Sequence, residues 1–157
     1  MLPPSLLVLR RPDEALEHTL DRWLSRHPLP GKAGERLVLL SPNWAPGPGA
    51  EPEAVPPCAV LLLPSSAAPL ASRFSARCAV SYGSGVRDSL TLSSLEGNRL
   101  VIAVQRELPA VTGGSVEQQE LVLPVPRGVS PLPVLAAAGA LLLLGARPEL
   151  IMADPPL

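Results

Sequence analysis

The sequence predicts an α/β fold, a three-layer domain with a short parallel sheet and a small antiparallel sheet. Residues 59–63 and 78–82 are largely apolar and a short helical segment separates them, which is typical of neighbouring parallel strands covered on both faces. From residue 88 onward, apolar residues alternate with polar ones, as in strands with one buried face. With 157 residues, of which 46% are hydrophobic, the chain is expected to form one domain, residues 1–157.

The beginning of the chain predicts two strands with a helix between them. An apolar run at residues 5–9 precedes a segment in which leucine and tryptophan recur at helical spacing. Asp13 is expected to cap this helix, and Pro28 with Gly31 to end it. Residues 37–40 predict the second strand.

A flexible loop is expected at residues 41–57, which are rich in proline and glycine. The segment has too few apolar groups to offset the entropy lost on ordering. Trp44 is the exception, since an aromatic side chain there either packs back on the core or contacts a partner. Trp44 is therefore the candidate partner-binding residue.

The remaining elements follow from hydrophobic periodicity. Residues 68–75 predict a short helix between the two parallel strands. Residues 89–125 predict an antiparallel sheet of three strands, with Gly97 and Asn98 in its first turn. Residues 131–144 predict a helix that is apolar on every side and should be buried.

Composition argues against two classes of partner. Lys and Arg number 13 against 14 Asp and Glu, and the basic residues are scattered, so neither nucleic acid nor a membrane is an expected partner. At the N-terminus the charges follow the apolar run, the reverse of a secretory signal, which predicts a cytoplasmic protein. Cys58 and Cys78 each open an apolar run and are expected to be buried, as free cysteines commonly are. A metal site is not expected, because no Cys or His stands at metal-ligand spacing from them.

Three places in the sequence resemble catalytic motifs only in part. Gly31 and Lys32 lack the earlier glycine and the later hydroxyl of a phosphate-binding loop. The turn at residues 83–85 begins like a dinucleotide fingerprint, but Asp88 stands where the third glycine belongs, so a strand-exit turn is the simpler interpretation. Ser84 lacks the first glycine of a nucleophile elbow. We therefore expect no catalytic residue, no metal and no cofactor.

Four segments between residues 58 and 151 resemble the latter half of the central domain of Mur ligases, the ATP-dependent enzymes that add amino acids to peptidoglycan precursors. The segments are Leu62-Leu63-Pro64-Ser65-Ser66, Ser81-Tyr82-Gly83, residues 123–130, and the helix from Ala136 to Leu144-Gly145. The resemblance implies the fold and a bacterial source. It carries over no catalytic residue, because Ser65-Ser66 replaces that family's acidic pair, Val129-Ser130 replaces its His-Asn pair, and no phosphate-binding loop precedes them.

Two functions follow as expectations. The first is a non-catalytic interaction or regulatory module that binds an unknown protein partner or forms a homo-oligomer. The alternative is a small-molecule-binding domain, for a nucleotide or a cell-wall precursor, derived from an ATP-dependent ligase. Its ligand is expected at the polar turn after the strand at residues 78–82, since ligands of α/β sheets bind at the carboxyl ends of strands. The candidate ligand-binding residues are Tyr82, Gly83, Ser84, Gly85 and Arg87.

Overall fold

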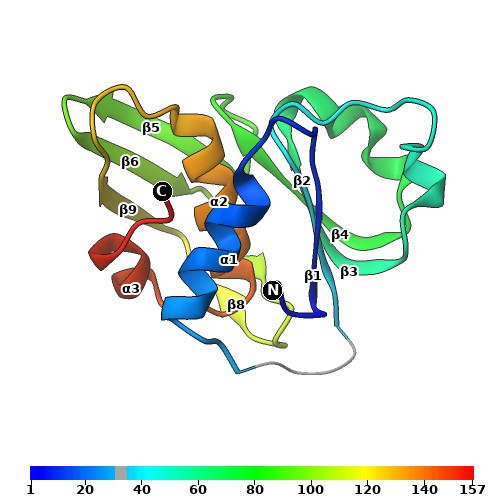
Figure 1. Ribbon diagram of the computed structural model, residues 1–157, viewed down its shortest axis with the longest axis horizontal. Helices are drawn as coiled ribbons and strands as arrows, with labels where there is room; N and C mark the ends of the chain where they lie inside the picture. Colours follow the sequence, from blue (N-terminus) through cyan, green and yellow to red (C-terminus); the bar gives the residue numbers. More distant parts are fainter. Residues whose placement is uncertain (31–34) are drawn as a thin grey trace.

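The structure, a computed structural model, describes residues 1–30 and 35–157, so that Gly31 and Lys32 lie outside the described residues. The elements are β1 (Leu6–Leu9), α1 (Leu16–Arg26), β2 (Leu37–Leu40), the 3₁₀ segment η1 (Pro52–Ala54), β3 (Cys58–Pro64), the 3₁₀ segment η2 (Ser65–Arg73), β4 (Ala76–Gly83), β5 (Leu90–Glu96), β6 (Arg99–Val104), β7 (Leu108–Pro109), β8 (Ser115–Val116), β9 (Gln119–Pro124), α2 (Pro131–Leu143) and α3 (Pro148–Ala153). In Figure 1, α1 and α2 cross in front of a twisted sheet.

The large sheet has seven strands in the order β1-β2-β3-β4-β5-β6-β9, and β1 to β5 pair in parallel. The predicted neighbours β3 and β4 are confirmed, with Val60 beside Cys78 and Leu62 beside Val80. A two-stranded antiparallel sheet, β7 with β8, completes the strands. The α/β class, with a parallel sheet and a small antiparallel one, is therefore confirmed.

The predicted position of the antiparallel strands is wrong in one respect. Strands β5, β6 and β9 do not form a sheet of their own, because β5 pairs in parallel with β4 through Tyr82 beside Leu90 and Gly83 beside Thr91. Parallel neighbours normally need a crossover of a dozen or more residues. Here the two strands overlap only at their ends, so that the short link at residues 84–89 is long enough.

Two helical segments also differ from their predicted form. Helix α1 starts with Ala15 at its cap position and has no side-chain capping bond, so Asp13 is not the cap. The helix expected at residues 68–75 is instead the 3₁₀ segment η2, which contains Pro69. Proline has no backbone N–H and clashes with the preceding turn of an α-helix, which favours the short 3₁₀ form here.

Helix α2 is the centre of the larger core, as its apolar sequence predicts. All its residues from Val134 to Leu143 are buried, between the sheet on one side and α1 and α3 on the others. The helix lies close against β5, since a Cβ placed on Gly139 would lie 2.7 Å from Cδ1 of Leu90. Residues of α1, α3 and the inward faces of all seven strands of the large sheet complete this core.

The opposite face of the sheet carries a second, smaller core. It is built from β2, β3, η2 and the loop at residues 41–57, and it includes Trp44, Ala67 and Phe74. Among the described residues, none from β5, β6 or β9 belongs to it. The sheet is therefore covered on both faces around β2 and β3, and on one face in its antiparallel half.

Candidate functional site

The carboxyl ends of β1 to β4 meet at one edge of the sheet, where α/β folds bind their ligands. The polar residues that follow these strands are Glu14, Ser41, Ser65 and Asp88. The turn after β4 was predicted as a site from the sequence, whereas the polar groups after β1, β2 and β3 were not. The position of Ser41 and Ser65 directly after apolar runs is the signal that would have found them.

Asp88 links the turn after β4 to the end of β3 through hydrogen bonds. Its side chain is buried, and Oδ2 accepts hydrogen bonds from the backbone N–H of Gly85 at 2.9 Å and from Oγ of Ser65 at 2.6 Å. The Asp88 carbonyl accepts a further bond from Nε2 of Gln105 at 2.7 Å. A Cβ on Gly83 would lie 2.0 Å from Oγ of Ser65. This turn is therefore filled by the chain's own side chains.

Tyr82 was expected to contact a ligand, and the structure places it in the core. Its side chain is fully buried, and its hydroxyl donates a hydrogen bond to the Leu40 carbonyl at 2.6 Å. Burial, followed by the nearby charge of Glu14, raises the pKa of Tyr82 far above its usual value. Tyr82 joins the ends of β2 and β4 and offers no surface to a ligand.

Glu14 forms a second polar cluster at the same edge. Its Oε1 accepts hydrogen bonds from Oγ of Ser41 at 2.5 Å and from the backbone N–H of Arg11 at 2.9 Å. Ser41 is completely buried, so the bond satisfies a hydroxyl that has no access to water. Within the described part of the chain, no buried side-chain nitrogen or oxygen lacks a hydrogen-bond partner.

The other predicted ligand residues have two different roles. Gly83 and Gly85 shape the turn around Asp88, while Ser84 and Arg87 are exposed. The Arg87 carbonyl accepts a hydrogen bond from Nη2 of Arg106 at 3.1 Å. The structure therefore brings Ser84 and Arg87 to the surface beside the sheet edge, but it does not gather all five residues around one space.

Trp44, the predicted partner-binding residue, packs back on the smaller core. It is 8% exposed, and its ring centroid lies 5.7 Å from that of Phe74. A bidentate pair between Glu53 and Arg73 joins the same loop to η2. In this conformation Trp44 is not available to a partner, because the core already surrounds it. The predicted flexibility of residues 41–57 stays a prediction.

The uncovered face of β6 and β9 was not anticipated as a site. Alternate residues Leu100, Ile102, Leu121 and Leu123 are fully buried under the helices, so the residues between them point away from the core. The outward residues form three rows of cross-strand pairs: Arg99 with Pro124, Val101 with Val122, and Ala103 with Glu120. Val122 is 43% exposed, so an apolar centre lies between a basic end and an acidic end. We call these six residues the outer face.

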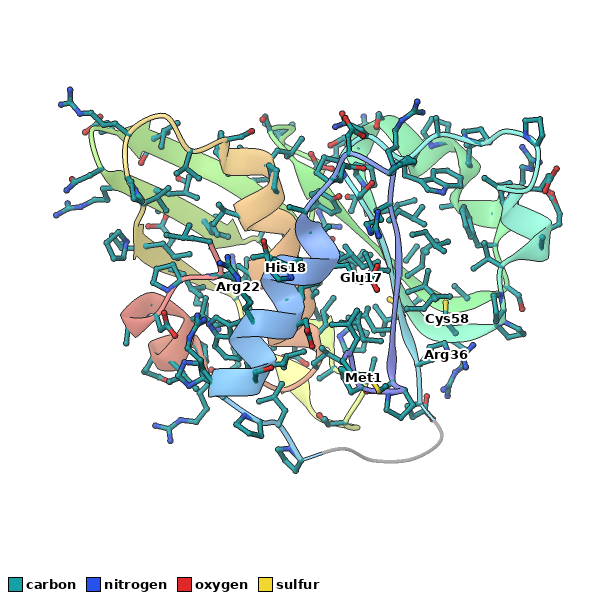
Figure 2. All side chains as sticks on the ribbon, viewed as in Figure 1. Met1, Glu17, His18, Arg22, Arg36 and Cys58 are labelled. Carbon is teal, nitrogen blue, oxygen red and sulfur yellow. The ribbon has the colours of Figure 1, made fainter. Side chains whose placement is uncertain are left out.

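The remaining titratable groups do not gather at the edge formed by the carboxyl ends of β1 to β4. His18 and Arg22 are exposed on the outer side of α1 (Figure 2). Cys58 is buried, which raises the pKa of its thiol, and Arg36 lies near it. In residues 1–30 and 35–157, no three His, Cys, Asp or Glu residues are grouped so that they could hold a metal ion.

No helix in the described ranges combines the length and the apolar character that a membrane crossing requires. Comparison with models of known protein families finds no match, and comparison with curated protein sequences finds no match either. The resemblance to Mur ligases therefore stays a prediction.

Proposed function

We propose that this protein is a non-catalytic α/β module that acts by binding another protein chain on the outer face of β6 and β9. The observation that carries the proposal is the contrast between two surfaces. At the strand ends, where α/β folds bind ligands, the polar side chains are engaged in hydrogen bonds around Asp88 and Glu14. On the outer face the exposed Val122 lies beside the half-buried Val101, and no element of the smaller core extends over them.

The chemistry at the strand ends supports the non-catalytic part of the proposal. Phosphoryl transfer depends on positioned groups that neutralise developing charge. Ser65 stands where the resembling family has an acid, and its hydroxyl donates to Asp88. Asp88 also accepts from Gly85 and is buried, so its carboxylate is engaged inside the turn. The cytoplasmic location and the bacterial source are part of this proposal.

One observation favours the alternative, a small-molecule site. Ser84 and Arg87 are exposed beside the end of β4, and an arginine there suits an anionic ligand. Thermal melting with millimolar ATP and magnesium tests it, because a ligand at one hundred times its dissociation constant stabilises by about 2.7 kcal/mol. We expect no change in melting temperature. A magnesium-dependent rise that the Ser84→Ala and Arg87→Ala variants abolish would replace the proposal by the alternative.

Site-directed photo-crosslinking in the cells that make the protein tests the proposal itself. A photoreactive residue at position 101 reports on the outer face, one at position 86 on the turn after β4, and one at position 68 on η2. Val86 and Ala68 are both exposed, so they serve as matched controls. We expect a discrete crosslinked product from position 101 alone. A product from position 86 instead, or no product from position 101, overturns the proposal.

A further inference from the structure

We propose that the chain docked on the outer face is a second copy of this protein, packed face to face across β6 and β9 with its strands in the opposite direction. The inference rests on the proposed function and names its partner. It comes from the positions of two opposite charges on the same surface, Arg99 and Glu120.

These two side chains cannot pair with each other inside one chain. Arg99 is level with Pro124 and Glu120 is level with Ala103, so they lie at opposite ends of the outer face. Four strand residues separate the two levels, a distance of about 13 Å at ~3.3 Å per residue. Among the described residues, no ion pair involves either side chain.

The basic end has additional neighbours. Glu96 lies opposite Arg99 on β5, and Nη2 of Arg127 comes within 3.9 Å of the Cβ position of Gly97 in the adjoining turn. This end therefore carries two arginines and one glutamate, which gives it a net positive charge. At the other end of β9, Glu120 is the charged residue of its row. The charge pattern along β6 and β9 is thus asymmetric, with an apolar middle.

A two-fold axis through the valine row makes this pattern complementary to itself. When the axis lies in the interface and perpendicular to the strands, it places the second copy's β6 and β9 over the first with reversed direction. Glu120 of one copy then meets the end that carries Arg99 in the other, and Val101 and Val122 pack at the centre. Such a contact is isologous, with each pair formed twice. The alternative two-fold axis, parallel to the strands, brings like charges together.

The interface is expected to be weak. Two strands spaced ~4.8 Å apart and about six residues long give a patch of roughly 10 by 20 Å, which is smaller than a standard protein–protein interface. Interfaces of standard size range from micromolar to picomolar affinity, so we expect a dissociation constant in the micromolar range or weaker for this smaller contact. The net charge of −1 does not oppose self-association.

Sedimentation velocity of the full chain over a range from 1 to about 500 μM measures this equilibrium. We expect the average mass to rise from that of one chain toward that of two. Val122→Lys places a charge at the centre of the interface and should weaken the dimer at least tenfold. Val86→Lys adds the same charge to a valine that is 90% exposed and outside the outer face, and should leave the dimer unchanged. Both variants should melt like the parent, because both positions are at the surface.

Charge reversal tests the geometry. Arg99→Glu alone places glutamates against glutamates, and Glu120→Arg alone places arginines against arginines, so each variant should be monomeric. An equimolar mixture of the two variants should dimerise again, since both pairs of the mixed dimer then have opposite charges. Loss of the dimer in each single variant supports the reversed-strand arrangement, because the arrangement with like ends together already pairs like charges in the parent. Rescue in the mixture shows that the loss is due to the charges at these two ends.

The outcomes separate this inference from the proposed function. A parent chain that stays monomeric at 500 μM overturns the inference, and so does a dimer that the mixed variants fail to restore. If the crosslinked product at position 101 contains a different protein, the proposed function stands and the second copy is not its partner. If the product contains two copies of this chain, both are supported.

Discussion

The Ser65 hydroxyl donates a 2.6 Å hydrogen bond to the Asp88 carboxylate, and this contact closes the turn where a ligand of an α/β sheet would enter. Ser65→Ala removes a donor from a buried carboxylate, which typically costs about 1–3 kcal/mol of unfolding free energy. The midpoint of urea denaturation measures the loss. Ser66→Ala is the matched control, because Ser66 is exposed and should change stability by less than about 0.5 kcal/mol. Equal effects at both positions would contradict this role for Ser65.

The turn also requires glycine at position 83. In Gly83→Ala the new Cβ would lie 2.0 Å from Oγ of Ser65, so the turn must shift and stability should fall by about 1–3 kcal/mol. Adding Ser65→Gly removes the clashing atom, so the double variant should lose less stability than the sum of the two single losses. Gly47→Ala, where a Cβ meets no atom within 4 Å, should be close to neutral. The prediction fails if Gly83→Ala is as stable as Gly47→Ala.

Helix α2 should be the most sensitive element of the fold. Leu142 is 2% exposed, and Leu142→Asp would bury a carboxylate without a partner. The cost is several kcal/mol against a total stability of roughly 5–15 kcal/mol, so the domain should unfold. Leu95→Asp is the control, since Leu95 is 51% exposed at the end of β5. Circular dichroism melting distinguishes them, and a cooperative parent-like melt of Leu142→Asp would show that α2 is not buried.

Asp154 should give the protein a stability term that disappears in acid. His27, at 2.6 Å, and then Arg26, at 3.0 Å, hydrogen-bond its carboxylate and lower its pKa below the usual 3.8. A lowered carboxyl pKa contributes stability that is present above the usual value and is lost as the pH falls through the lowered one. Because the side chain is 38% exposed, the contribution is small. The difference in melting temperature between the parent and Asp154→Asn should therefore shrink as the pH falls from 5 to 2, and a constant difference would contradict it.

Sequence patterns were sufficient for the elements that depend on local periodicity. The buried run of β3, the neighbouring strand β4 and the apolar helix α2 follow from composition over a few residues. The junction of β4 with β5 does not, because the end-to-end pairing of Tyr82 with Leu90 allows a link too short for a usual parallel crossover. Sheet membership of β5, β6 and β9 depends on this one contact.

The candidate sites, like the sheet, could be predicted only in part, because they depend on contacts between residues far apart in the sequence. Proline and glycine around Trp44 indicate a loop, but its contact with Phe74 joins residues thirty positions apart. The alternation in β6 and β9 predicts one outward face, yet only the arrangement of the helices determines that this face stays uncovered. In the sequence Tyr82 stands at the start of a polar turn, which suggested a ligand contact. In the structure its hydroxyl instead donates a hydrogen bond to the Leu40 carbonyl at the end of β2.

The most direct test of the central claim is a dilution series followed by two-dimensional ¹H–¹⁵N NMR of the full chain. If the outer face is the binding surface, the amide signals of residues 99–103 and 120–124 should shift with concentration, while those of residues 84–87 stay constant. Val122→Lys should abolish the shifts, and Val86→Lys should leave them. Concentration-dependent shifts that gather at residues 84–87 and leave β6 and β9 unchanged would contradict the account.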